Sequence, residues 1–420
     1  MDSVMPVPRI IQLATTIKDS VLKIQETLDT LGALSPSFDE NAPPLPAQIS
    51  AAQDMVLDAT AELHDLLTEP TNMIHRSARS DRFACLQVIS HFGIAELIPP
   101  NGQASFKEIS GRTPLTEQMV SRIIRHATMM RIFCEPKPGI VKHTKASRIL
   151  ADPDARDWTQ AGIEELSPAG AKFAKALEKW PASEEPNETG FSLAHNIAGS
   201  IYDVLAENSD RAARFSSAMK MMTSRPAFDL SYGTDYYDWK SLGEAQIVDV
   251  GGARGHFAVA LARRYSQLRI VVQDMDKVIE NADAGEVAER VRFFAHSLFD
   301  PQPIRADVYF FRWILHNWSD AYCIRILRAQ LPALKPGARL VIQEVFMPEP
   351  GSMAYWNERD IRSMDLEMAF TFNSRERTLA DWEALFKAAD AGFVLKGVVN
   401  PPGSAMGILE FVWEGHNGSA

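Results

Sequence analysis

Apolar residues recur at helical spacing through the first half of the chain. Between Ile10 and Leu31 they occupy every third or fourth position, which predicts an amphipathic helix. A second helix is predicted from Ile49 to Leu67, after a segment rich in proline and polar residues. The same spacing predicts helices over Ser167 to Lys179 and Ser192 to Thr223. We interpret the first two helices as packing or dimerisation elements, because neither offers a group suited to chemistry.

Beyond Trp239 short apolar runs alternate with helical or loop stretches. Alternation of this kind predicts a parallel sheet with right-handed crossovers, in which ligands bind at the carboxyl ends of the strands. The predicted strands are 247–250, 268–273, 291–295, 307–311 and 339–343. We therefore predict an α/β protein with an N-terminal helical domain over residues 1–225 and a C-terminal Rossmann-like domain over residues 226–420.

The segment from Ser80 to Leu150 has the outline of a winged helix, with short helices followed by two extended pieces. The helix from Thr116 to Met130 takes the place of the recognition helix, so DNA binding is the obvious function for such a module. The basic groups of this helix are few, namely Arg122, Arg125 and His126. We predict a dimerisation module and keep DNA binding as the alternative.

The stretch from Ile247 to Phe257 is a strand that breaks into glycines and resumes as a helix. Gly251, Gly252 and Gly255 allow positive φ and close approach of the backbone to a ligand. Backbone N–H groups at the start of the helix point at that ligand. Ala253 stands where the dinucleotide fingerprint needs a glycine, which makes NAD the poorer ligand.

The turn matches D-x-G-x-(G/A)-x-G instead, the pattern of S-adenosylmethionine (SAM) methyltransferases. Asp249 stands at the strand end, where a carboxylate can meet the ammonium group of the cofactor. The next strand ends in Asp274, where an acid accepts both ribose hydroxyls in other nucleotide-binding α/β units. The alternative is a ligand-free α/β turn with a helix-capping aspartate.

Composition and net charge limit the kinds of molecule that the protein is expected to bind. Of 420 residues 46% are hydrophobic and 23% charged, as in an ordinary globular protein. The net charge of −11 disfavours nucleic acid and anionic membranes, so a small, largely uncharged substrate fits better. No basic leader and no apolar run of membrane length is found, which predicts a cytoplasmic protein. The three cysteines lack metal-type pairing and predict buried thiols in a reducing compartment: Cys85, Cys134 and Cys323.

Three groups suited to chemistry follow the later strands, namely His316, Glu344 and Glu376. With the motifs around them, the chain resembles the plant caffeate-type and fungal SAM-dependent O-methyltransferases of small molecules. The resemblance covers most of the chain and follows the order of the family. It rests on Asp249–Gly255, Trp313–Asp320, Leu334–Leu340, Glu344 and Arg375–Thr378.

The resemblance implies that His316 is the general base and that Glu344 and Glu376 flank it to orient and polarise the imidazole. The chemistry agrees with this. A phenol of pKa ~10 must lose its proton as its oxygen attacks a methyl sulfonium, and a neutral histidine of pKa ~6.5 is a suitable acceptor. The alternatives are a core histidine at position 316 and exposed ion pairs of Glu376 with Arg375 and Arg377.

The resemblance also implies SAM as methyl donor, S-adenosylhomocysteine as product, and an intertwined homodimer in which early helices of one subunit can close the partner's pocket. The acceptor is expected to be phenolic or polyketide-like. Met219, Met222, Met368 and Phe372 are candidates for its pocket, although methionines more commonly fill cores. The residues expected to contact the cofactor are Asp249, Gly251, Gly252, Gly255, Asp274, Ser297, Leu298 and Arg312.

Three positions depart from the plant pattern. Ala253 replaces a glycine, which is tolerable at negative φ, Ser297 replaces an aspartate that meets the adenine, and Asn317 replaces an aspartate after the base. Some fungal relatives of this fold are pericyclases, which use SAM as a fixed positive charge without transferring its methyl group. Ser297 and Asn317 favour that alternative, whereas the retained histidine and acids favour methyl transfer. A non-catalytic winged-helix regulator is a third hypothesis.

Overall fold

The computed structural model describes residues 6–415 and separates them into two compact units. The first unit contains the described residues up to Ser167 together with residues 209–222 and 350–360. The second contains residues 168–208, 223–349 and those from 361 onward. The chain passes between the units several times, so the single boundary after residue 225 stays a prediction.

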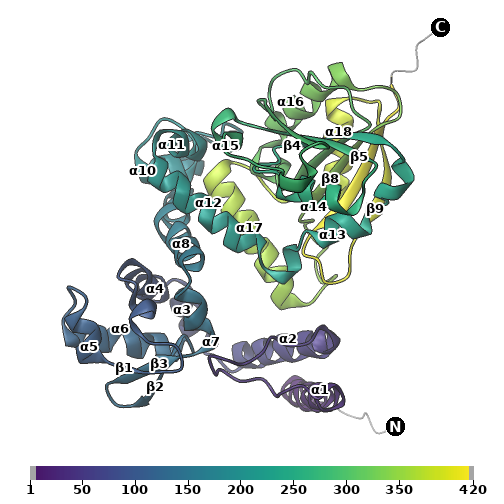
Figure 1. Ribbon diagram of the computed structural model, residues 1–420. Coiled ribbons are helices and arrows are strands. Elements are labelled where there is room, and N and C mark those ends of the chain that lie inside the picture. The colour runs from purple at the N-terminus through teal and green to yellow at the C-terminus, as the bar shows by residue number, and fades with distance from the viewer. Residues whose placement is uncertain (1–5, 416–420) are drawn as a thin grey trace, which may run out of the picture. The chain divides into compact units, whose positions relative to one another are not determined.

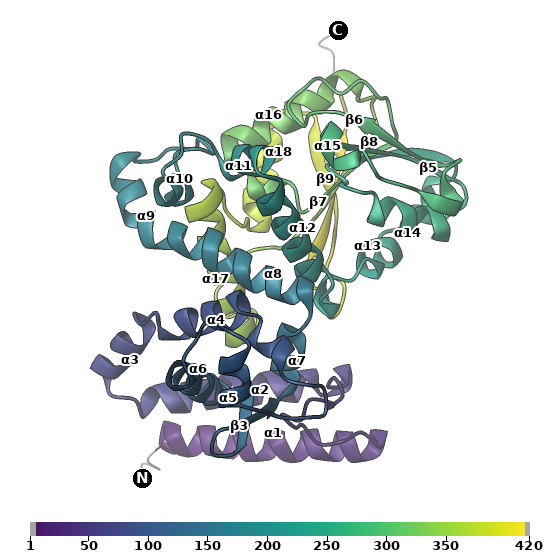
Figure 2. The same cartoon turned by 60° about the vertical axis from the view of Figure 1, so that its left-hand side comes forward.

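The first unit begins with the two predicted helices, which are confirmed as α1, Arg9–Leu31, and α2, Ser50–Leu66. They lie side by side in Figure 2 and bury Leu13 and Leu28 of α1. Helix α1 is capped at its C-terminus by Gly32, which takes a left-handed conformation with φ of 63°. Further helices of this unit are α3 (Pro70–Ser77), α4 (Asp81–His91), α5 (Phe106–Gly111), α7 (Lys145–Leu150) and α8 (Pro153–Ala161).

The first unit also contains a small antiparallel sheet with the order β1-β3-β2 (Figure 1). Helix α6, Glu117–Met129, is capped by the Thr116 hydroxyl and leads into this sheet. The arrangement of helix and hairpin agrees with the predicted outline, while the winged-helix and dimerisation interpretations stay predictions. The strands are β1 (Ala104–Ser105), β2 (Phe133–Lys137) and β3 (Ile140–His143).

The prediction of one helix from Ser192 to Thr223 was wrong. Asn196 takes φ of 52° and ends the first piece, and Ser200 starts the next with a capping box to Asp203. The apolar spacing runs on through these caps, which is why periodicity alone missed them. The helices are α10 (Gly190–His195), α11 (Ile201–Glu207) and α12 (Ser209–Thr223), after the predicted α9 (Ser167–Lys179).

The second unit is built on a seven-stranded sheet with the order β6-β5-β4-β7-β8-β10-β9. The five predicted strands are confirmed and run parallel, but β10 pairs antiparallel with both β8 and β9. The sheet is therefore mixed and larger than the parallel sheet that was predicted. Its strands are β4 (Ala245–Val250), β5 (Leu268–Asp274), β6 (Val291–Ala295), β7 (Val308–Arg312), β8 (Ala338–Glu344), β9 (Phe393–Val399) and β10 (Gly407–Trp413).

Helices cover both faces of this sheet, with α13 and α14 on one side and α16 and α18 on the other (Figure 1). The alternation of side chains in a strand explains the two layers, since Ile247 packs on one face and Val248 on the other. Helices of this unit are α13 (Ser231–Tyr236), α14 (His256–Arg264), α15 (Asp276–Ile279), α16 (Asp320–Gln330) and α18 (Leu379–Ala389), with most of α17 (Tyr355–Phe372).

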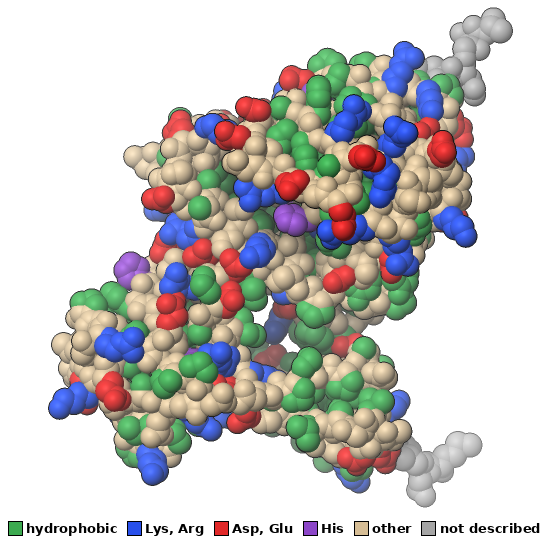
Figure 3. All heavy atoms as spheres, in the orientation of Figure 1, with side chains coloured by type: hydrophobic (Ala, Val, Ile, Leu, Met, Phe, Trp, Pro, Cys, Tyr) green, Lys and Arg blue, Asp and Glu red, His purple; other side chains and the backbone are tan. Residues whose placement is uncertain are grey.

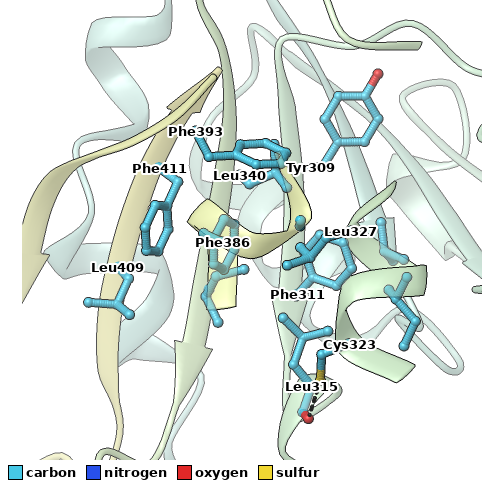
Figure 4. Packing of buried hydrophobic residues seen from close by; sticks show 14 of the residues in the cluster. Tyr309, Phe311, Leu315, Cys323, Leu327, Leu340, Phe386, Phe393, Leu409 and Phe411 are labelled. Carbon is cyan, nitrogen blue, oxygen red and sulfur yellow. Dashed lines mark hydrogen bonds between the residues drawn. The ribbon is translucent and has the colours of Figure 1, made fainter. Parts of the chain in front are cut away.

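The core beneath α16 and α18 is rich in aromatic rings (Figure 4). Phe386 of α18 stacks on Phe411 of β10 with ring centroids 3.7 Å apart and an interplanar angle of 3°. Leu315, which follows β7, is fully buried in the same cluster. The turn after β7 is thus anchored in the main core of the sheet.

Surface properties agree with the composition. On the face shown in Figure 3, Lys and Arg side chains are interspersed with Asp and Glu, so the net charge of −11 does not gather in one patch there. Within residues 6–415, no helix combines the length and the apolar character needed to cross a membrane.

We predict that Phe386→Ala lowers the free energy of unfolding by about 3–5 kcal/mol, because it opens a cavity beside Phe411. Leu379→Ala, on the same helix at a residue that is 39% exposed, is the matched control and should cost less than about 1 kcal/mol. Denaturant unfolding of the two variants measures the difference. Equal losses would mean that the aromatic stack contributes no more than a surface contact.

Candidate active site

Four neighbouring parallel strands bring their carboxyl ends to one edge of the sheet. Val250 of β4 is in register with Gln273 of β5 and Phe311 of β7, and Arg312 of β7 with Gln343 of β8. The residues at or just beyond these positions therefore share one region of the second unit. They include the predicted site residues Asp249, Asp274, Arg312, His316 and Glu344.

The glycine turn after β4 leaves no room for side chains. Gly251 and Gly255 take φ of 72° and 75°. A Cβ on Gly251 would lie 2.5 Å from Cδ1 of Ile314, and one on Gly252 would lie 2.5 Å from Oδ2 of Asp249. The turn is held to the sheet, because the Gly251 and Gly252 amides donate to the Gln273 carbonyl at 2.8 and 3.1 Å. The three glycines, called the glycine cradle below, thus form a turn that is packed too closely for a Cβ at any of them.

Ala253 departs from the expectation of negative φ, since its φ is 48°. A left-handed conformation costs an L-residue roughly 1–2 kcal/mol. The Ala253 amide donates to Oδ2 of Asp274 at 2.9 Å, which helps to offset this strain. The missing glycine is therefore a strained alanine whose amide ties the turn to the acid at the end of β5.

The two acids of this edge differ in their surroundings. Asp249 is 3% exposed, and its Oδ2 has no hydrogen-bond partner among the described residues. Burial raises its pKa to about 7, with Asp274 adding to the rise and Arg312 opposing it. Asp274 is partly exposed; burial raises its pKa, and hydrogen bonds from the Met275 and Ala253 amides oppose the rise. Asp249 is therefore a buried acceptor that favours a cationic partner.

Arg312 lies at the end of β7 between these acids and Glu344. It donates from Nε to Oε1 of Gln343 at 3.2 Å and from Nη2 to the Phe228 carbonyl at 2.8 Å. Burial lowers the pKa of its guanidinium, and the negative charges of Asp249 and Glu344 oppose this. Arg312 thus keeps a positive charge between two buried carboxylates.

The turn after β7 presents His316. Trp313 opens the turn with φ of 58°, a rare conformation for a bulky residue, and its carbonyl accepts from Nδ2 of Asn317 at 3.2 Å. His316 is 5% exposed, and its Nδ1 lies 2.9 Å from Oε1 of Glu376. The contact with Glu376 is the one hydrogen bond of this ring within the described part of the chain, and it leaves Nε2 without a partner there. The ring is thus held by one nitrogen.

The charges around His316 raise the pKa of its imidazole. Burial lowers this pKa, but the negative charges of Glu376 and Glu344 together outweigh the burial. The side chain of Glu344 binds the backbone of the turn, since its Oε1 accepts from the Ile314 and Leu315 amides at 2.9 Å each. Glu376 therefore orients the ring directly, and Glu344 acts through the turn and through its charge.

The exposed ion pairs considered for Glu376 are wrong. Arg375 and Arg377 pair with Asp320 at 2.8 and 2.7 Å. The Glu376 carboxylate is buried against His316 instead, and its amide donates to Oδ1 of Asp365 at 2.8 Å. Asp365 was missed from the sequence, because the acid of a long helix carries no motif of its own.

An aromatic cluster adjoins the turn. Trp318 stacks on Tyr202 of α11 and on Tyr322 of α16, with centroids 5.4 and 5.7 Å apart. Burial and the charge of Asp274 raise the pKa of Tyr202, so α11 lies near the end of β5. Ser297 accepts from the Phe299 amide at 3.3 Å, and Leu298 packs against the core cluster. Sequence analysis gave no signal for Tyr202.

The predicted acceptor residues fall in different places. Met368 and Phe372 lie on α17 in the second unit, 9% and 6% exposed, and the Phe372 ring is 5.8 Å from that of Tyr202. Met219 and Met222 lie on α12, in the segment that belongs to the first unit. Their contribution to an acceptor pocket stays a prediction.

Comparison with known proteins identifies the family. A model of the O-methyltransferase domain matches residues 176–394. O-methyltransferase PaMT of Phomopsis amygdali is 39% identical over 412 residues, covering 96% of this chain and 96% of that protein. The chain belongs to the O-methyltransferase family. A chlorophenol O-methyltransferase of Trichoderma longibrachiatum is 36% identical over 423 residues, covering 97% of the chain and 90% of that protein.

Solved structures share the fold of this O-methyltransferase. OxaC in complex with SAH and oxaline matches with a TM-score of 0.76 at 22% identity, covering 95% of this chain and 99% of that one. The LepI complex with SAM matches with a TM-score of 0.75 at 23% identity and the same coverage. The protein is a SAM-dependent O-methyltransferase, and SAM is its cofactor.

The residues at the strand ends fit this cofactor. The glycine cradle presents backbone without side chains, and Asp249 supplies a buried oxygen, Oδ2, with no partner among the described residues. Asp249 would hold the ammonium group of SAM and Asp274 its ribose hydroxyls. These two assignments stay predictions, as do those of Ser297, Leu298 and Arg312.

We predict that the affinity for SAM weakens as the pH falls below about 7, because a proton on Asp249 competes with the ammonium group. The loss approaches tenfold per pH unit when one proton is taken up. Calorimetric titration with SAM at several pH values measures it. Asp249→Asn should bind more weakly at neutral pH and lose this pH dependence, and a variant that kept the same dependence would exclude Asp249 as its source.

Proposed function

We propose that this enzyme methylates a hydroxyl of a phenolic or polyketide-like secondary metabolite, with His316 as general base. The observation that carries the proposal is the orientation of the imidazole. Nδ1 is taken by Glu376 at 2.9 Å, so the ring presents Nε2 to a proton donor. Nδ1–H donates a hydrogen bond to Glu376, which keeps the proton on Nδ1 and thereby selects the tautomer with a basic Nε2.

The position of the base relative to the glycine cradle supports the same role. Ile314 precedes His316 by two residues, and its Cδ1 would be met at 2.5 Å by a Cβ on Gly251. The turn of the base and the turn of the cofactor cradle are therefore in contact. An acceptor oxygen near Nε2 would lie beside the cofactor site.

The proposed chemistry is a single displacement. Bound SAM supplies a methyl group activated by its sulfonium. The acceptor hydroxyl gives its proton to Nε2 of His316 as its oxygen forms the new bond to the methyl carbon, while the bond from that carbon to sulfur breaks. The buried charges of Glu376 and Glu344 stabilise the imidazolium that results. The glycine cradle and the base turn align the reacting atoms.

The acceptor class rests on the pocket candidates and on the relatives. Met368 and Phe372 offer apolar and aromatic surface that suits a flat ring. One relative is named for chlorophenol, and another, from Cladonia grayi, for a grayanic acid biosynthesis cluster. These names support a phenolic secondary metabolite as the acceptor here.

The proposal includes a homodimer held by the N-terminal unit. Helices α1 and α2 leave large apolar side chains exposed, including Ile11, Leu22 and Met55 at 52%, 51% and 54%. An apolar helical face of this kind suits another helix better than water.

Pericyclase activity is the second candidate. A solved structure described as a pericyclic reaction enzyme matches with a TM-score of 0.74 at 23% identity, a likeness of fold alone. The pair of His316 and Glu376 favours methyl transfer, because a catalyst that keeps its SAM intact has no need of this base. Mass spectrometry of the products decides between them: a gain of one methyl group supports transfer, and an isomerised acceptor supports the rival.

We predict that His316→Ala lowers kcat for methylation of a chlorophenol by about 10²–10⁴-fold, the usual contribution of a general base. Binding of SAM should persist, since His316 is not among the predicted cofactor contacts. Labelled SAM measures transfer and calorimetry measures binding. A variant that binds SAM and still transfers methyl groups at the rate of the unaltered enzyme would remove His316 from the mechanism.

We predict that kcat falls as the pH drops through the raised pKa of His316, which lies above the ordinary value of 6.5. Only the neutral ring accepts a proton, so activity is present above this pKa and lost below it. In Glu376→Gln the loss of a negative charge lowers the pKa of His316, so the acid limb should move to lower pH. The pH dependence of kcat in both proteins measures this, and an unmoved limb would contradict the coupling.

A further inference from the structure

The loop from Ser374 to Arg377 holds the backbone of the base turn as well as the ring of His316. Ser374 donates from Oγ to the His316 carbonyl and to the Trp318 carbonyl, the latter at 2.8 Å. A hydroxyl has one proton, so these two carbonyls share it. The carbonyls of His316 and of Trp318 are thus bound from a loop about sixty residues further along the chain.

Arg377 also binds the backbone of the base turn. Its side chain is 0% exposed, and it donates from Nη1 to the Leu315 carbonyl at 3.1 Å and from Nη2 to the Trp318 carbonyl at 2.8 Å. The same guanidinium pairs with Asp320 through Nε at 2.9 Å and Nη2 at 2.7 Å. It also lies over the Trp382 ring, 5.2 Å from its centroid. One planar cation therefore joins both ends of the turn to the start of α16.

The Leu315 carbonyl receives a second donor, which shows how closely this turn is held. The thiol of Cys323 lies 3.1 Å from it, as the dashed line in Figure 4 marks. Leu315 itself is fully buried in the main core. The turn is therefore fixed by its side chain, its carbonyls and its amides, the last through Glu344.

The burial of the Arg377 guanidinium is unfavourable for stability by itself. Removing a guanidinium from water is costly, and an apolar side chain of similar size commonly serves stability as well or better. The neighbouring Arg375 shows the ordinary alternative, since it is 45% exposed and pairs with Asp320 and Asp381. Among the hydrogen bonds of the described residues, Arg377 binds the carbonyls of the turn and Arg375 does not.

We propose that Arg377 is a positioning residue for methyl transfer, which fixes the base turn so that the imidazole meets Glu376 with one nitrogen and the acceptor with the other. The inference rests on the proposed role of His316. Arg377 is not among the residues proposed to contact the acceptor or the cofactor. It acts through the Leu315 and Trp318 carbonyls, which flank the base.

The charge of Arg377 gives the proposal a second consequence. The groups whose charges act on His316 are Glu376 and Glu344, which favour the imidazolium, and Arg377, which opposes it. Asp320 and Arg375 lie beyond Arg377, and Asp365 lies behind Glu376. Without the positive charge of Arg377, the two carboxylates raise the pKa of His316 further. The imidazole then keeps its proton to higher pH.

The test compares Arg377→Gln, Arg377→Lys and the matched control Arg375→Gln in the full chain. Methyl transfer from labelled SAM to a chlorophenol gives kcat and KM, calorimetry gives SAM affinity, and thermal unfolding checks the fold. Nitrogen NMR of labelled histidine follows the titration of His316 without turnover, with the signal assigned by its absence in His316→Ala.

We expect Arg377→Gln to lower kcat by about 10²-fold, the loss that a displacement of about 1 Å in a catalytic group produces. Its SAM affinity should stay within about threefold of the unaltered enzyme, and the titration of His316 should move to higher pH. Arg377→Lys keeps the charge but cannot bind both carbonyls in a planar fork, so the titration should stay in place while kcat remains at least about tenfold low. Arg375→Gln should change kcat by less than about threefold, as for an exposed ion pair.

Equal kcat in the Arg377→Gln and Arg375→Gln variants would overturn the inference, and so would an unmoved titration of His316 in Arg377→Gln. Should Arg377→Gln fail to fold, Arg377→Lys decides, because unaltered kcat in that variant also overturns it. Failure of the proposed function looks different. In that case His316→Ala keeps full activity, whereas failure of the positioning role alone leaves activity dependent on His316 and independent of Arg377.

Discussion

The hydrogen bond between Nδ1 of His316 and Glu376 is the interaction on which the candidate site depends. It joins a turn at the end of β7 to the loop before α18, and both partners are buried, so water does not weaken it. A buried carboxylate is stable only when a cation or a hydrogen-bond donor compensates its negative charge. That charge in turn raises the pKa of the neighbouring histidine. The same contact therefore fixes the loop, orients the ring and makes it more basic.

Much of this site was predictable, because strand order places residues without reference to side-chain detail. Asp249, Asp274, Arg312 and Glu344 were predicted to share one edge, since each ends a parallel strand, and the structure brings them there. The glycine turn was predictable for a different reason, because the positive φ that Gly251 and Gly255 take is characteristic of glycine. What residue type does not specify is a strained backbone at other residues. Ala253 and Trp313 take left-handed conformations that only their hydrogen-bond partners explain.

Elements at the margins were harder to predict. The antiparallel strands β9 and β10 follow the last helix, and nothing in the alternation of strand and helix announces them. The breaks between α10, α11 and α12 depend on capping residues that apolar periodicity ignores. Asn317 shows the reverse case, where a departure from the family pattern has a visible use. Its amide donates to the carbonyl of the strained Trp313, which an ionised carboxylate cannot do.

Helix α17 takes part both in positioning the base and in the proposed lining of the acceptor pocket. Asp365 on this helix accepts from the Glu376 amide, while Met368 and Phe372, on the same helix, are the proposed lining for the acceptor. A substitution that tilts the helix to admit a bulkier metabolite would also move Asp365. Glu376, which is bound to Asp365 and orients the base, would then be displaced. Diversification toward new acceptors along this helix is therefore confined to changes that reshape its side chains and leave its axis in place.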